Sequence, residues 1–114
     1  MAPFTLSDSY VVLGRTPAML RLWLDGLPEP WVRDNEGPDT WSPYDVVGHL
    51  IHGEQTDWMP RVRQIVDGRG HEPFTPFDRF AMQRRDQTRP LTALLDEFAA
   101  LRAANLKALQ SLGL

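Results

Sequence analysis

The sequence contains no cysteine among its 114 residues. It can form neither a disulfide nor a thiol nucleophile, and a bound metal has to rely on His, Asp and Glu. It also lacks an apolar run near the ~18 residues that suggest a membrane span. The N-terminus has no basic segment followed by a long apolar stretch, as a secretory signal would have. We therefore expect a cytoplasmic protein with no membrane partner.

Positive charge is also scarce. The chain has 15 acidic and 12 basic residues and a formal net charge of -3. No net positive field would attract nucleic acid, so neither DNA nor RNA is expected as a partner. A chain of this length has room for one domain, residues 1–114, and its 42% hydrophobic content is enough for one modest core.

Apolar residues recur at helical spacing in three segments, whereas the alternation typical of strands is found nowhere. The first segment covers about residues 7–27 and carries an N-cap and N1 signature at Thr16-Pro17, where the helix is expected either to kink or to restart. Residues 29–40 have the prolines, glycine and polar cluster of an exposed connection. The third segment covers residues 91–112, with Thr92 as its cap. The pattern predicts an all-α fold.

The second segment has the clearest helix start in the sequence. Ser42 stands at the N-cap, Pro43 at the first helical position and Asp45 at the third. The helix should continue to about Gly68, with a bend near Pro60, because proline removes one backbone hydrogen bond.

Residues 71–90 form a long connection whose phenylalanines are expected to pack on the bundle, with a short helical turn at 78–84. Antiparallel neighbours usually need only ~2 to 8 connecting residues, so this length predicts that the second and third helices are parallel. The predicted shared core consists of Trp23, Leu24, Leu50, Trp58, Phe98 and Leu101.

Two of the three histidines, His49 and His52, lie one helical turn apart. Residues i and i+3 are about 60 degrees apart on a helix, so both imidazoles could approach one ion. Spacing alone favours a hydrogen-bonded or solvated histidine, because a catalytic zinc takes about three protein ligands. His49 points closer to the interior than His52. The third, His71, reads as an exposed loop residue.

Glu54 is a carboxylate on the buried side of the second helix. We favour its pairing with an arginine such as Arg61 or Arg63, and a role beside a metal is the alternative. Asn105 interrupts the apolar stripe of the third helix. It either forms a hydrogen bond across the helix interface or lies at a solvated edge.

These residues resemble the DinB/YfiT-like family of helical-bundle metalloenzymes. The resemblance is sharpest in the second helix, over the run Trp41-Ser42-Pro43-Tyr44-Asp45-Val46-Val47-Gly48-His49-Leu50 followed by Glu54, Trp58 and Arg61. Residues 16–27 are similar to the family's first helix, and Asp96-Glu97-Phe98 with Arg102 to its third. The resemblance implies a DinB-like bundle with three of the four core helices present and the fourth lacking.

In that family a zinc or nickel ion is held by one histidine of the second helix and two of the fourth. The resemblance places the first ligand on His49 and leaves the other two without a counterpart, with His52 or His71 as the candidate substitutes. It implies a metal-dependent thiol S-transferase or hydrolase acting on a small-molecule substrate. Catalytic residues are not assigned, Glu54 is a candidate to orient a ligand or relay a proton, and the shortened chain is expected to be inactive.

The alternative is a non-catalytic helical module. Three amphipathic helices leave one side of a four-helix core open, and soluble monomers seldom expose apolar patches beyond a few hundred square ångströms. This open face would bind a partner or form a homodimer. The alternative requires no histidine chemistry.

Overall fold

The computed structural model describes residues 2–114, and within that range the chain forms helices and loops with no strand. The elements are α1 (Leu6–Leu24), α2 (Glu29–Arg33), α3 (Pro43–Thr56), α4 (Trp58–Val66), the 3-10 helix η1 (Ala81–Arg84) and α5 (Leu91–Ser111). The predicted all-α class is confirmed.

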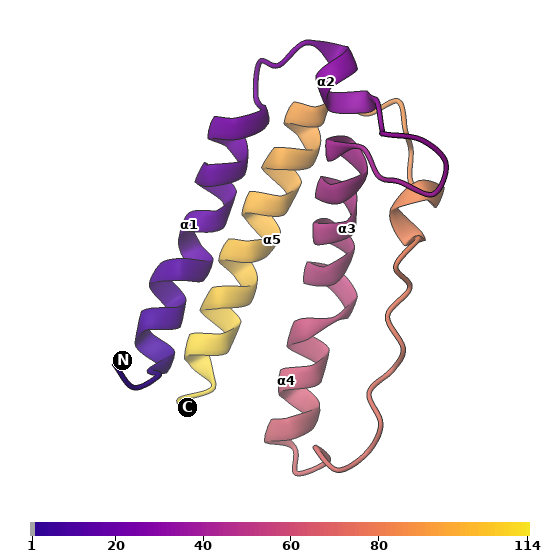
Figure 1. Cartoon of the computed structure of the whole chain (residues 1–114). Coiled ribbons are helices and arrows are strands. Elements are labelled where there is room, and N and C mark those ends of the chain that lie inside the picture. The colour runs from indigo at the N-terminus through magenta and orange to yellow at the C-terminus, as the bar shows by residue number, and fades with distance from the viewer. Residues whose placement is uncertain (1) are drawn as a thin grey trace.

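The long helices lie side by side, with α5 between α1 and the α3–α4 pair (Figure 1). The Tyr44 hydroxyl, near the start of α3, donates to the Arg89 carbonyl just before α5. Further along, Glu54 of α3 meets Arg102 of α5. Helices α3 and α5 therefore run parallel, as the length of the connection predicts, while α1 is antiparallel to both (Figure 1).

Helix α1 begins at a conventional cap, where the Thr5 side chain accepts a hydrogen bond from the backbone N–H of Asp8. It then continues through Pro17, so of the two outcomes expected at Thr16, a kink or a restart, the restart does not occur. Proline has no N–H to donate to the carbonyl four residues earlier, which is that of Leu13. That carbonyl instead accepts a hydrogen bond of 2.8 Å from Arg102. A tertiary contact thus replaces the missing helical bond.

The expected exposed connection at 29–40 contains the short helix α2. Pro30 lies in its first turn, where a missing N–H is tolerated. Val32 is 3% exposed and belongs to the core cluster. This one buried side chain attaches α2 to the end of the bundle, a contact that the proline-rich composition did not reveal.

Helix α3 starts with the predicted capping box. Ser42 accepts from the backbone of Asp45, and Asp45 accepts in return from the backbone of Ser42, both at 3.1 Å. The helix is interrupted at Asp57, which separates α3 from α4. The expected bend near Pro60 therefore falls three residues earlier, because Pro60 cannot donate to the Thr56 carbonyl.

The cap of α5 is Pro90 and not Thr92, which lies inside the first turn. Pro90 is extended, and its carbonyl accepts hydrogen bonds from the backbones of Ala93 and Leu94. Within the connection, η1 falls inside the predicted turn. Its Met82 is 2% exposed, a buried position that the sequence analysis missed.

The core lies between α3 and α5, and Phe98, Val47 and Ile51 are fully buried. Leu24, Leu50 and Leu101 pack against this core, and Trp58 is half-buried. The placement of Trp23 in the core was wrong, since its side chain is 64% exposed. Successive helical residues point about 100 degrees apart, so Trp23 and Leu24 cannot both face α5.

Candidate functional site

His49 lies on α3 between two aromatic rings. Its ring centroid is 4.8 Å from that of Trp41, which precedes the helix, and 5.1 Å from that of Phe77 in the long connection. The imidazole is half-buried, and its Nδ1 is enclosed without a hydrogen-bond partner in residues 2–114. An unpaired buried nitrogen costs about 1–3 kcal/mol, so it calls for an explanation such as a water, an ion or a ligand.

Charge and burial both favour the neutral form of this histidine. Burial of the ring, and then the nearby His52 and Arg79, lower the pKa of His49 below its ordinary value. A neutral imidazole keeps a lone pair on one nitrogen, and this is the form that binds metal ions. The lowered pKa thus favours the neutral imidazole of His49.

The other two histidines, His52 and His71, do not complete a metal site with His49. His52 is half-buried, and its ring centroid is 5.1 Å from that of Phe77, so Phe77 contacts both histidine rings. His71 is exposed, as expected. Across residues 2–114 no three His, Asp or Glu side chains gather closely enough to hold a metal ion. His49 and His52 thus contribute at most two imidazoles, and the described residues contain no complete metal site.

Glu54 is 4% exposed and is bound by two side chains of α5. Its Oε1 accepts from Arg102 Nε at 2.8 Å, and its Oε2 accepts from Asn105 Nδ2 at 2.9 Å. Its partner is thus an arginine, as favoured, but the residue is Arg102 and neither Arg61 nor Arg63. Asn105 forms the hydrogen bond across the interface that was one of its two interpretations.

The structure does not bring Glu54 together with His49. They are five positions apart, which corresponds to about 140 degrees around a helix. Glu54 faces α5, whereas His49 faces Trp41 and the connection.

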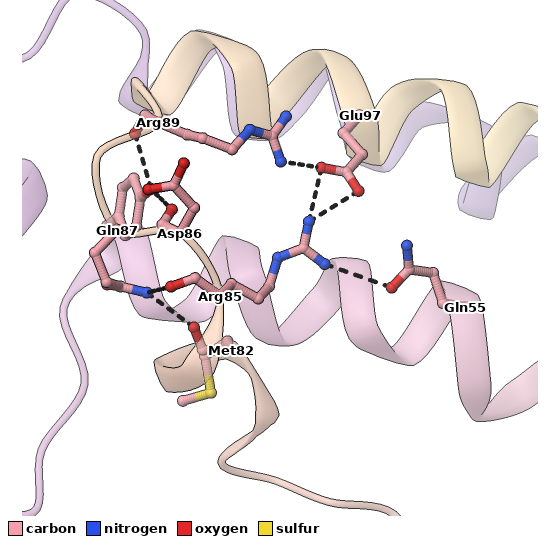
Figure 2. Close-up of polar contacts among 8 residues, drawn as sticks. Gln55, Met82, Arg85, Asp86, Gln87, Arg89 and Glu97 are labelled. Carbon is pink, nitrogen blue, oxygen red and sulfur yellow. Dashed lines mark hydrogen bonds and ion pairs between the residues drawn. The ribbon is translucent and has the colours of Figure 1, made fainter.

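A second charged cluster attaches the connection to the bundle (Figure 2). Both carboxylate oxygens of Glu97 accept from Arg85 Nη2 at 2.9 Å, and Oε2 also accepts from Arg89 Nη1 at 2.5 Å. Arg85 reaches Gln55 of α3 as well. Burial alone would raise the pKa of Glu97, but the hydrogen bonds from Arg89 and Arg85 outweigh burial, and the pKa is lowered.

The sequence analysis missed this cluster and the two rings that enclose His49. The only local signal was the concentration of arginines at 84–89, just before α5. No sequence pattern indicated that Trp41 or Phe77 contacts His49. Phe77 in particular lies 28 positions further along the chain.

The described residues thus form a helical bundle in which the half-buried His49 and His52 lie one turn apart on α3. The family model of the DinB superfamily matches residues 13–114, which is nearly the whole chain. The chain therefore belongs to the DinB superfamily. A search of curated proteins found no match. Within residues 2–114, none of the helices combines the length and the apolar character needed to cross a membrane.

Proposed function

We propose that this chain acts as a metal-dependent enzyme of the DinB type, either a thiol S-transferase or a hydrolase. In this proposal His49 is a ligand of a divalent ion such as zinc or nickel. The observation that supports this proposal is the enclosed Nδ1 of His49, which has no hydrogen-bond partner within residues 2–114. The lowered pKa of the ring and the family membership point the same way.

One imidazole cannot hold zinc selectively, because a catalytic site takes about three protein ligands. In this proposal the remaining ligands are His52 of the same copy and histidines of a second copy. His52 is the first candidate, because it lies one helical turn from His49 on α3. In a symmetric dimer, two copies of His49 and His52 would provide up to four nitrogens.

The proposal is tested by calorimetric titration of zinc and nickel, at protein concentrations where the oligomeric state is measured in parallel. We expect weak or absent binding to the monomer, and binding of one ion per two chains to an assembled form. His49→Ala should abolish that binding, and the exposed His71→Ala should leave it unchanged. Tight one-to-one binding by a monomer that survives His49→Ala would overturn the proposal, as would the absence of binding in every form.

A non-catalytic helical module remains the second candidate, and the outer side of α1 supports it. Every residue of α1 is half-buried or exposed. On its outer side Leu22 is 76% and Val12 68% exposed, and Val11 and Met19 are exposed nearby. Such a surface suits a second copy of the chain.

A further inference from the structure

An open cavity of about 750 Å³ lies beside the histidine site. Its walls come from the end of α1, from α2, from residues 34–41 and from the start of α3, which meet at one end of the molecule (Figure 1). Small-molecule pockets typically measure ~300–1,000 Å³, so this cavity has the size for a ligand of one or two rings.

Three tryptophans line this cavity. Trp23 and Trp31 are 64% and 71% exposed, and they project from two different helices. Trp41 forms the wall shared with His49, and the Arg79 guanidinium lies 5.8 Å from its ring centroid. Trp23 and Trp31 therefore offer the more accessible aromatic surfaces. Neighbouring exposed rings on adjacent elements are the kind of apolar patch that marks a binding site.

The charge of the lining has a single sign. Asp34 and Glu36 contribute carboxylates, and none of the lining residues is Lys, Arg or His. Neither carboxylate joins an ion pair within residues 2–114. Two hydrogen bonds close the turn that carries them: Thr40 Oγ1 accepts from the backbone of Glu36 at 3.0 Å and donates to the Gly37 carbonyl.

We propose that this cavity binds a small organic cation with an apolar body, such as an arylalkyl ammonium. The faces of Trp23 and Trp31 carry the negative side of the ring quadrupole, which attracts ammonium groups. Asp34 and Glu36 each add a negative charge, and Leu20, Leu24 and Val46 line the apolar part of the cavity. An anion of the same size would meet two uncompensated carboxylates and is excluded.

A cationic ligand is favoured because its charge is complementary to the carboxylates of Asp34 and Glu36. A purely apolar partner, including the outer side of α1 in a second copy, would leave both carboxylates without compensation and would gain nothing from them. A cation satisfies the carboxylates and the indoles at once. The inference is independent of metal binding, since it involves neither His49 nor His52.

The test measures the binding of three small aromatic probes of similar size to the intact chain, by calorimetry and by tryptophan fluorescence at low salt. The probes are benzyltrimethylammonium, its neutral isostere neopentylbenzene, and phenylacetate. We expect the cation to bind at least tenfold more tightly than the neutral isostere, and phenylacetate not to bind. Added salt should weaken the binding of the cation alone, because screening acts on charge.

Variants assign the binding to this cavity. The double variant Asp34→Asn/Glu36→Gln should weaken the cation at least fivefold without affecting neopentylbenzene. Trp31→Leu should weaken the binding of both the cation and neopentylbenzene. Because Trp31 is exposed, the melting temperature of this variant should equal that of the wild type. The matched control is Asp67→Asn, an exposed carboxylate at the far end of α4. Equal affinities for cation and neutral isostere, an unaffected double variant, or a cavity that is blocked when the chain self-associates would each overturn the proposal.

Discussion

Arg102 is the residue on which three helices converge. Its guanidinium pairs with Glu54 of α3 and also donates to the Leu13 carbonyl of α1. That carbonyl has no helical donor because Pro17 lacks an N–H. One buried side chain on α5 therefore neutralises a carboxylate and satisfies the helical carbonyl that a proline leaves open.

Removal of Glu54 should leave Arg102 as an uncompensated charge. Both are buried, with 4% and 8% exposure. Breaking a buried pair from one side costs about 3–5 kcal/mol, whereas replacing both partners by apolar residues is often close to neutral. We expect Glu54→Leu to lower the free energy of unfolding by about that amount, measured in urea. The double variant Glu54→Leu/Arg102→Met should lose less, and a single variant within 1 kcal/mol of wild type would contradict this account.

Glu97 should make stability depend on pH in the acidic range. Its pKa is lower in the folded state than in the unfolded chain, where it is about 4.3. The stabilisation is therefore fully present above about pH 4.3 and is lost as the pH falls through the folded pKa. Unfolding free energies of wild type and Glu97→Gln, measured from pH 7 to pH 3, should converge on acidification. Parallel curves would mean that the contacts with Arg85 and Arg89 contribute nothing.

At the scale of elements, the contact between α3 and η1 depends on a glycine. A Cβ added to Gly48 would lie 2.9 Å from Cβ of Met82, closer than such atoms normally approach. Met82 is itself 2% exposed, so it has little room to move. The long connection thus packs on α3 at a point where only a hydrogen fits.

Gly48→Ala should destabilise the chain by about 1 kcal/mol. Overpacking typically costs ~1–3 kcal/mol, and the better helix propensity of Ala recovers only ~0.5–1 kcal/mol. Gly53 provides a matched control on the same helix, since an added Cβ there would meet nothing within 4 Å. Gly53→Ala should therefore stabilise the chain by about 0.5–1 kcal/mol in thermal or urea unfolding. Two changes of the same sign would show that the contact with Met82 is loose.

At the scale of the whole molecule, one long helix is packed much less closely than the others. Helix α1 contacts α5 along one side and presents Val12, Met19 and Leu22 on the other. The core lies between α3 and α5 instead. A dimer that shares His49 would have to form on the side of α3 that faces Trp41 and the connection. Self-association of the non-catalytic kind is expected instead through the outer side of α1.

If the chain dimerises through this surface, Leu22→Asp should shift it to the monomer. Sedimentation velocity over a range of concentrations measures the effect, and a tenfold or larger increase in the dissociation constant is expected, since charges are excluded from such contacts. Ile65→Asp, on the exposed side of α4, is the control and should leave association unchanged. A wild-type chain that stays monomeric at high concentration would rule this interface out.

The sequence by itself determined the features that depend on near neighbours. Helical periodicity gave the all-α class, the capping box of Ser42 and Asp45 gave the start of α3, and the length of the connection gave the parallel arrangement of α3 and α5. The choice of His49 as the candidate ligand came from the resemblance carried by its own helix. Such signals are local, because they reflect backbone hydrogen bonding and the spacing of side chains along one element.

The tertiary structure decided what depends on residues far apart in the chain. Packing of α5 against α3 places Arg102 beside Glu54, which lies 48 positions away in the chain. The same arginine donates to the Leu13 carbonyl, which Pro17 leaves without a helical donor, and α1 continues through the proline. The tertiary structure turned Trp23 away from the core and placed Trp41 and Phe77 around His49. These outcomes follow from which helix faces meet. The choice of contacting faces depends on how the whole core packs, and a pattern within one helix does not specify it.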